Sequence, residues 1–97
     1  MILVVGLSYR TAPVEVRERV ATTDVPSVLA RLTSRKELRE AIFVSTCNRV
    51  EVFAEAHGED GASDAVQAIT EELAHGSTLD RHELSQHLYE KSDVEAV

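Results

Sequence analysis

The chain has 97 residues, 43% of them hydrophobic, and a formal net charge of −7, which fits one small globular domain. No stretch approaches ~20 consecutive apolar residues and no basic stretch precedes the apolar N-terminus, so neither a membrane span nor a secretory signal peptide is expected. The single cysteine excludes an internal disulfide, which agrees with a cytoplasmic location.

The charge is divided unevenly along the chain. Residues 1–49 carry eight basic and five acidic side chains, a net of +3, whereas residues 50–97 carry two basic and twelve acidic ones, a net of −10. A basic face on the first half is compatible with a phosphate backbone as ligand, but two solvated helix faces of opposite sign are the simpler explanation.

The first half of the chain predicts one strand followed by two helices. Residues 2–9 form an apolar run typical of a strand, and the segment 8–13 ends it. Pro13 suits the first turn of a helix, where its missing N–H costs nothing. Asp24 predicts the N-cap of a second helix, and Pro26 its first turn. The expected apolar positions of the two helices are Val14, Val16, Val20, Val28, Leu29 and Leu32.

The second half predicts three more strands. Residues 41–47 and 50–56 have the apolar or alternating pattern of strands, and the acidic stretch 58–61, with its two glycines, indicates a loop. Residues 87–90 are expected to form the last strand.

Two helices are expected between these strands. Ser63 or Asp64 would cap the first, and Gly76 would end it. Asp80 with Glu83 three residues later has the spacing of a capping box, which predicts a short helix. The expected core stripe of the longer helix is Val66, Ile69 and Leu73.

This order of elements predicts an α+β fold of the ferredoxin-like, split βαβ type, a sandwich with the helices packed on one face of the sheet. In this prediction the two central strands are parallel neighbours. Gly6 is explained by a turn and not by a phosphate-binding loop.

The most informative segment is the pentapeptide Ser45-Thr46-Cys47-Asn48-Arg49, which holds the only cysteine. A structural cysteine usually lies inside an apolar run and behaves as a small hydrophobe. Here hydroxyl, amide and guanidinium groups surround the thiol, and such groups can stabilise a thiolate and support covalent catalysis. From residue chemistry alone, an inert cysteine is the commoner case.

An extended pentapeptide would place Ser45, Cys47 and Arg49 on one side, and Thr46 and Asn48 on the other. Cys47 and Arg49 would then lie roughly 6–7 Å apart. The Arg49 guanidinium would either lower the pKa of the thiol or clamp a substrate carboxylate, and these two roles compete. Nearby N–H groups, with Thr46 and Asn48, would donate to an oxyanion.

The four histidines do not predict a metal site. No two of them are four residues apart, as ligands on one helix face would be, and no second cysteine accompanies them. Surface positions are expected for His57, His75, His82 and His87.

Three segments together resemble the glutamyl-tRNA reductase family. They are residues 6–14 with Val16-Arg17-Glu18-Arg19, the pentapeptide 45–49 followed by Glu51, and His87-Leu88-Tyr89 with Ala96-Val97. The resemblance runs through the whole chain in order. The cysteine segment and the Thr-Ala-Pro segment are highly specific in combination.

The resemblance implies an NADPH-dependent oxidoreductase that reduces glutamyl-tRNA to glutamate 1-semialdehyde, the first step of tetrapyrrole (porphyrin) biosynthesis from glutamate. Cys47 would attack the ester and form a thioester intermediate. Arg49 would hold the side-chain carboxylate of the substrate, and Thr46 and Asn48 would line the glutamate pocket.

By the same resemblance, residues 1–97 are the N-terminal catalytic, glutamyl-binding domain, expected to be truncated just before its C-terminal part, where a further histidine would follow Val97. The NADPH-binding and dimerisation domains would lie outside this chain. No cofactor-binding residue is therefore assigned, and this fragment alone is not expected to complete the reduction. The expected partners are glutamyl-tRNA, a second copy of the full-length enzyme and the next pathway enzyme, without membrane or DNA.

Three questions stay open at this point. Arg10 is either a surface arginine or a tRNA contact, and Tyr9 and Tyr89 either pack at strand ends or stack on a base. The whole chain could instead be a small non-catalytic ferredoxin-like binding or regulatory module with a structural Cys47. A catalytic thiol would alkylate below about pH 8 and respond to Arg49→Ala, whereas a buried thiol would resist until unfolding.

Overall fold

The computed structural model describes residues 2–21, 24–46, 48–57 and 61–92. Strands and helices follow one another in these ranges as β1 (Ile2–Ser8), α1 (Val14–Ala21), α2 (Val25–Ser34), β2 (Leu38–Ser45), β3 (Arg49–Ala56), α3 (Ala62–Ser77), α4 (Arg81–Ser85) and β4 (Tyr89–Ser92). No helix in the described ranges is both long and apolar enough to span a bilayer.

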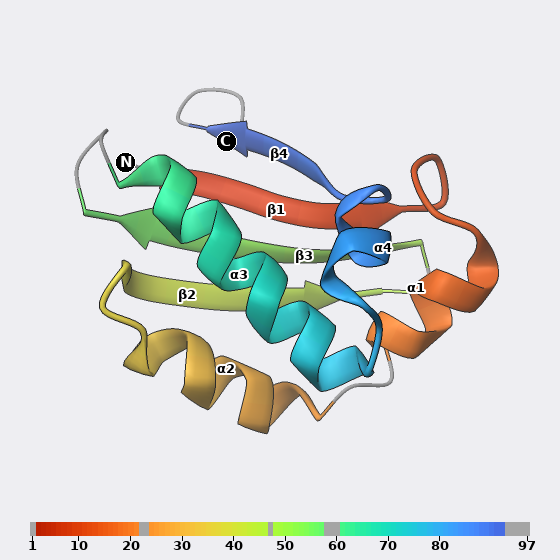
Figure 1. Cartoon of the computed structure of the whole chain (residues 1–97), viewed down its shortest axis with the longest axis horizontal. Coiled ribbons are helices and arrows are strands. Elements are labelled where there is room, and N and C mark those ends of the chain that lie inside the picture. The colour runs from red at the N-terminus through yellow and green to blue at the C-terminus, as the bar shows by residue number, and fades with distance from the viewer. Residues whose placement is uncertain (1, 22–23, 47, 58–60, 93–97) are drawn as a thin grey trace.

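The four strands form one antiparallel sheet in the order β2-β3-β1-β4, with the helices on one face of it (Figure 1). This confirms the predicted α+β class and is compatible with the split βαβ pattern. The prediction of parallel central strands is wrong, because β1 and β3 pair antiparallel. The β2–β3 hairpin reverses the chain, so β3 runs antiparallel to β2 and lies between β2 and β1. The parallel strands of the split unit are therefore β1 and β2, which are not neighbours.

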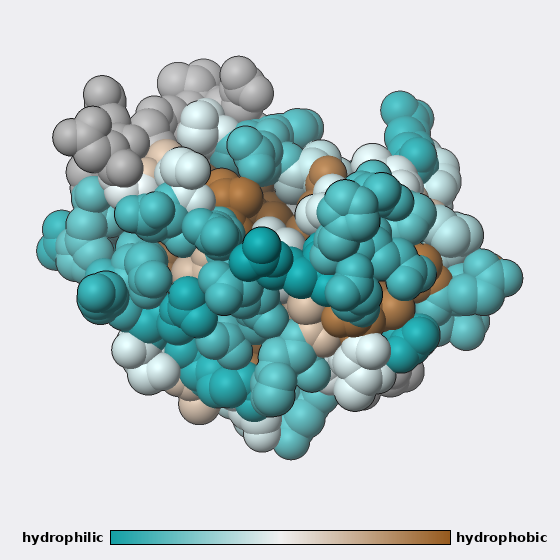
Figure 2. All heavy atoms as spheres, in the orientation of Figure 1, coloured by the Kyte–Doolittle hydropathy of each residue, from teal (hydrophilic) through white to brown (hydrophobic). Residues whose placement is uncertain are grey.

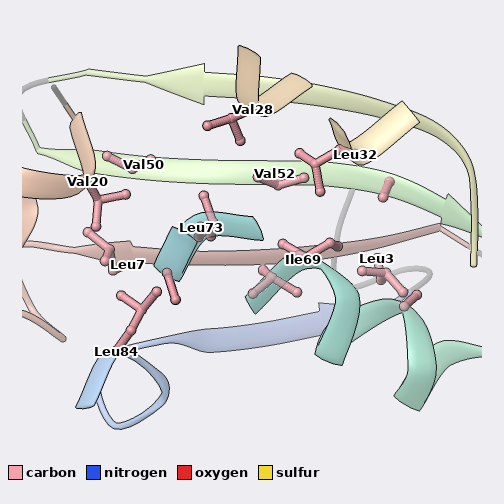
Figure 3. Close-up of a cluster of buried hydrophobic side chains, with 14 of the residues drawn as sticks. Leu3, Leu7, Val20, Val28, Leu32, Val50, Val52, Ile69, Leu73 and Leu84 are labelled. Carbon is pink, nitrogen blue, oxygen red and sulfur yellow. The ribbon is translucent and has the colours of Figure 1, made fainter. Parts of the chain in front are cut away.

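The core lies between the sheet and the helices, which Figure 3 shows from within. Leu3, Val5 and Leu7 of β1 point to this side, because alternate residues of a strand share a face. Ile69 and Leu73 of α3 lie over them and are fully buried. The predicted stripe of α3 is thus confirmed in its last two members, while its first, Val66, is half-buried.

Two predicted helix caps are present. The Asp24 carboxylate accepts hydrogen bonds from the Ser27 N–H at 3.3 Å and the Ser27 hydroxyl at 2.8 Å, at the start of α2. The Asp80 carboxylate accepts the Glu83 N–H at 3.1 Å, at the start of α4. Each bond satisfies one of the N–H groups that a helix leaves open at its first turn.

The ends of α3 differ from the prediction. Ser63 and Asp64 lie inside its first turn, and no described side chain caps its start. The helix also runs through Gly76, and Thr78 takes the left-handed conformation at its end (φ 60°). Arg19 holds Thr78 there by donating to its carbonyl and hydroxyl oxygens at 3.1 and 2.8 Å. This contact is distant in sequence, so a local pattern could not reveal it.

The strand boundaries are shifted from the prediction. β2 starts earlier, at Leu38, and includes the charged residues Arg39 and Glu40. Both are exposed on an edge strand, where polar side chains face water at no cost. β4 begins at Tyr89, two residues later than expected, because the turn after α4 occupies residues 86–87 and Leu88 separates it from the strand.

The two faces of the sheet differ. One face packs against the helices and forms the core, and the outer surface on that side of the molecule is largely hydrophilic, with hydrophobic atoms visible over β1 between α3 and β4 (Figure 2). The opposite face, here called the open face, is covered by no described helix. Cross-strand pairing places Ser8 beside Arg49, and Gly6 between Glu51 and Tyr89, on this open face.

Candidate functional site

The turn between β2 and β3 is held by Thr46. Its N–H donates to the Arg49 carbonyl at 2.8 Å. Its hydroxyl oxygen accepts the N–H groups of Asn48 at 3.3 Å and Arg49 at 3.2 Å. Cys47, which follows Thr46 and precedes Asn48 in the sequence, lies outside the described residues, and its distance from Arg49 stays a prediction.

The expectation of an extended pentapeptide is wrong for the residues that the structure describes. Ser45 ends β2 and pairs with Val50 on the helix-covered side, whereas Arg49 begins β3 and pairs with Ser8 on the open face. Alternation of side chains holds within a single strand, and here a hairpin turn intervenes. The N–H groups that follow the cysteine bond the hydroxyl of Thr46, so they are already committed to the turn.

The side chains of Asn48 and Arg49 are available to a ligand. Both residues are exposed. Within the part of the chain that the structure describes, the Arg49 guanidinium has no hydrogen bond or ion pair, and the Asn48 side-chain amide has no hydrogen bond. A guanidinium without a protein partner can offer its full planar fork to a carboxylate.

A second segment meets this turn. The Tyr9 N–H donates to the Asn48 carbonyl at 2.9 Å. The loop after β1 is itself closed at its base, because the N–H groups of Thr11 and Ala12 both donate to the Ser8 carbonyl at 3.0 Å. Two of the three segments singled out in the sequence therefore lie side by side, fixed by backbone bonds.

A groove of about 480 Å³ opens beside the turn. Its lining includes Arg49 together with side chains from β1, its following loop and β4. The charged and aromatic members are Tyr9, Arg10, Arg49, Glu51, Tyr89 and Lys91. The groove thus gathers Arg49 with Arg10 and both tyrosines, whereas Thr46 and Asn48 lie outside its lining.

Tyr89 and Glu51 form a hydrogen-bonded pair in this groove that the sequence did not predict. The tyrosine hydroxyl donates to Glu51 Oε2 at 2.5 Å. Burial chiefly, and then the bond to Glu51 and its charge, raise the pKa of Tyr89 to about 12. The neighbouring Arg49 acts weakly in the opposite direction.

Gly6 makes room for this pair, and its assignment to a turn is wrong, because it lies within β1 between Glu51 and Tyr89. A Cβ at this position would lie 2.6 Å from the Val50 carbonyl oxygen and 2.8 Å from Glu51 Cγ. A glycine inside a strand pattern signals such close approach, and this signal could have been used.

The histidines lie apart from one another. His57, His75 and His82 are exposed, and His87 is half-buried with Nδ1 3.2 Å from the Thr11 carbonyl oxygen. Within residues 2–21, 24–46, 48–57 and 61–92, no group of three or more His, Cys, Asp or Glu residues is arranged to hold a metal ion.

The comparison with family models decides the family. Residues 5–97 match the model described as the glutamyl-tRNAGlu reductase N-terminal domain. The chain belongs to this family. The resemblance seen in the sequence is thereby confirmed, and it extends over nearly the whole chain.

Curated relatives of this glutamyl-tRNA reductase N-terminal domain point the same way. The chain is 46% identical to the glutamyl-tRNA reductase of Salinispora arenicola and 45% identical to that of Salinispora tropica, each over 99% of its length. It is 41% identical to the glutamyl-tRNA reductase of Prochlorococcus marinus, again over 99% of its length. The chain spans only about a fifth of the length of these relatives, 21% or 22%.

Proposed function

We propose that this chain is the acyl-accepting catalytic domain of a glutamyl-tRNA reductase, with the Cys47 thiolate as nucleophile. The sulfur attacks the ester carbonyl of glutamyl-tRNA and forms a C–S bond. The ester C–O bond breaks, the terminal hydroxyl of the tRNA leaves with a proton, and a glutamyl thioester stays on Cys47. The observation that carries this proposal is the hydrogen-bonded turn of Thr46, Asn48 and Arg49, the residues that flank Cys47 in the sequence, in which the Arg49 guanidinium has no described partner.

The flanking residues have separate proposed roles. Arg49 binds the side-chain carboxylate of the glutamyl group by a two-pronged hydrogen bond. Asn48 lines the glutamate pocket through its side-chain amide, which bonds no described residue. Thr46 lines the same pocket and also shapes it, because its hydroxyl accepts the two N–H groups that fix the turn.

The reductase chemistry needs NADPH, which supplies a hydride when bound, and the described residues do not fit this cofactor. Dinucleotide sites of the common type use a glycine-rich turn between parallel strands and a helix. Here neighbouring strands are antiparallel, and the described glycines lie in β1, beside α3 and within α3. We therefore propose that NADPH binds outside the described residues. We also propose that the full-length enzyme is a cytoplasmic homodimer that passes its product to the next pathway enzyme.

Acylation of this chain tests the proposal directly. Glutamyl-tRNA with a radiolabelled glutamyl group is mixed with the chain, which is then digested and mapped by mass spectrometry. We expect a hydroxylamine-sensitive label on Cys47, none in Cys47→Ser, and transfer about 10- to 100-fold slower in Arg49→Ala, since hydrogen bonds to charged groups contribute about 1.5–3 kcal/mol.

Arg39→Ala is the matched control, because Arg39 is an exposed arginine on the same sheet, distant from the turn in the β2–β3 register. It should transfer the label at the wild-type rate. Label on another side chain would refute the nucleophile assignment. Absence of transfer, with a thiol that alkylates only on unfolding, would instead favour a non-catalytic module with a structural cysteine.

A further inference from the structure

The groove beside the turn pairs each of its two tyrosine rings with a cationic side chain. The sequence has two tyrosines, and both line this groove. The Arg10 guanidinium carbon lies 5.6 Å from the centre of the Tyr9 ring, and the Lys91 ammonium lies 5.9 Å from the centre of the Tyr89 ring. Surfaces that bind single-stranded nucleic acids use this combination, because bases stack on rings while cations meet phosphates.

Tyr9 is held in place by hydrogen bonds but does not pack in the hydrophobic core. Its N–H is bonded to the Asn48 carbonyl, and its hydroxyl accepts the Arg10 Nε–H at 3.0 Å. Yet 52% of its surface is exposed, whereas Ser8 before it is buried. An oriented ring that faces solvent is a ready stacking surface.

The charge of the groove is opposite to that of the chain. The sequence carries −7 overall, but the charged lining consists of Arg10, Arg49 and Lys91 against the single carboxylate of Glu51. That carboxylate accepts the hydroxyl of Tyr89, so it already has a partner within the protein. The groove is therefore a cationic site on an acidic protein, suited to an anionic ligand.

We infer that this groove binds the single-stranded 3′ end of the tRNA, with the terminal base stacked on Tyr9 and phosphates near Arg10 and Lys91. The inference rests on the proposed function, in which this tRNA carries the ester that Cys47 attacks. The backbone bond from Tyr9 to Asn48 then sets the separation between the stacked base and the acyl-accepting turn. Arg49 stays free for the side-chain carboxylate of the glutamyl group.

A binding cycle with two probes tests the stacking. The probes are fluorescein-labelled RNA minihelices that end in single-stranded ACCA, or in the same sequence with an abasic terminal nucleotide. Binding to the chain is measured by anisotropy. Because stacking of one base contributes about 1–3 kcal/mol, we expect loss of the terminal base to weaken binding about 5- to 150-fold in wild type and in Tyr9→Phe. In Tyr9→Ala both probes should bind with the same, weakened affinity.

The salt dependence tests the phosphate contacts. In Lys91→Ala and in Arg10→Ala, the slope of log K against log salt should fall by about 0.7, the value for one phosphate of a single strand. Lys36→Ala removes an exposed lysine outside the groove and should leave the slope unchanged. Circular dichroism checks that each variant is folded.

The outcomes separate this inference from the proposed function. Cys47→Ala should bind the ACCA minihelix as wild type does, because stacking needs no thiol. Retention of the full ACCA-over-abasic preference in Tyr9→Ala would overturn the stacking inference, even if Cys47 is still acylated in the wild type. If no acyl group is transferred but Tyr9→Ala still abolishes the ACCA-over-abasic preference, the assignment of Cys47 as nucleophile is overturned and the inferred binding site stands.

Discussion

Gly6 decides what the open face holds at its centre. Glycine in a strand costs backbone entropy and offers no side chain to pack. Here it lies between two strands whose side chains need the same space, and Glu51 reaches Tyr89 across it. One missing Cβ thereby permits the hydrogen bond at the floor of the groove.

This pair should be visible in a titration of the phenol groups. We expect Tyr89 to ionise with a midpoint of about 12, measured as phenolate absorbance in Tyr9→Phe, where Tyr89 is the only tyrosine. In Tyr9→Phe with Glu51→Gln, the midpoint should fall but stay above 10, because burial is the larger cause of the shift.

The effect on stability has a definite sign. The folded-state pKa of Tyr89 lies above the ordinary 10, so its contribution is complete below pH 10 and declines as the pH rises through 12. Tyr89→Phe should be less sensitive to pH in this window. A midpoint near 10 in the folded Tyr9→Phe protein would contradict the hydrogen-bonded arrangement.

At the scale of helices and strands, local side-chain bonds define some boundaries and distant contacts define others. Asp24 caps its own helix through Ser27, three residues later, so the neighbouring sequence is enough to predict its role. The end of α3 depends on Arg19 of α1, and Ser63, Asp64 and Gly76 gave a misleading local signal.

Replacement of Asp24 tests whether a capping side chain contributes more to stability than an uncapped first-turn residue does. Asp24→Ala should lower the free energy of unfolding by about 1 kcal/mol, because the Ser27 N–H loses its acceptor. The matched control is Asp64→Ala, which removes no cap bond in α3 and should cost only a few tenths through the helix dipole. Urea unfolding followed by circular dichroism measures both, and equal losses would contradict the assignment of the caps.

The sequence predicted the elements better than their arrangement. Val28 and Leu32 of α2, and Ile69 and Leu73 of α3, are each four residues apart, and this helical period depends only on local spacing. The direction of β3 relative to β1 follows from the hairpin and the path of the whole chain, which no local window contains.

The candidate site could likewise be predicted from the sequence in part only. The residue types of the pentapeptide indicated covalent chemistry, and the resemblance indicated the family. The bonds of the Thr46 hydroxyl, the link from Tyr9 to Asn48 and the meeting of Tyr89 with Glu51 required the folded chain. Sequence spacing gives no information on pairs that lie so far apart.

At the scale of the whole molecule, stability depends on one core that α3 shares with the sheet. Leu73 is 1% exposed, and Leu73→Ala should lower the free energy of unfolding by about 2–5 kcal/mol. This is a large share of the roughly 5–15 kcal/mol typical of a domain. Val14→Ala, at 47% exposure on α1, should change it by less than about 0.5 kcal/mol. Urea midpoints compare the two, and a mild Leu73 effect would contradict a single shared core.

The central place of β1 has a consequence for synthesis on the ribosome. Ile2 pairs with Glu55, and Leu3 pairs with Ser92, so the strand made first finds its partners only near the middle and the far end of these residues. Such long loops must close before any ladder of β1 forms, which slows folding. The nascent apolar strand therefore stays unpaired until β3 and β4 have been translated, and until then it offers an exposed hydrophobic segment to a chaperone.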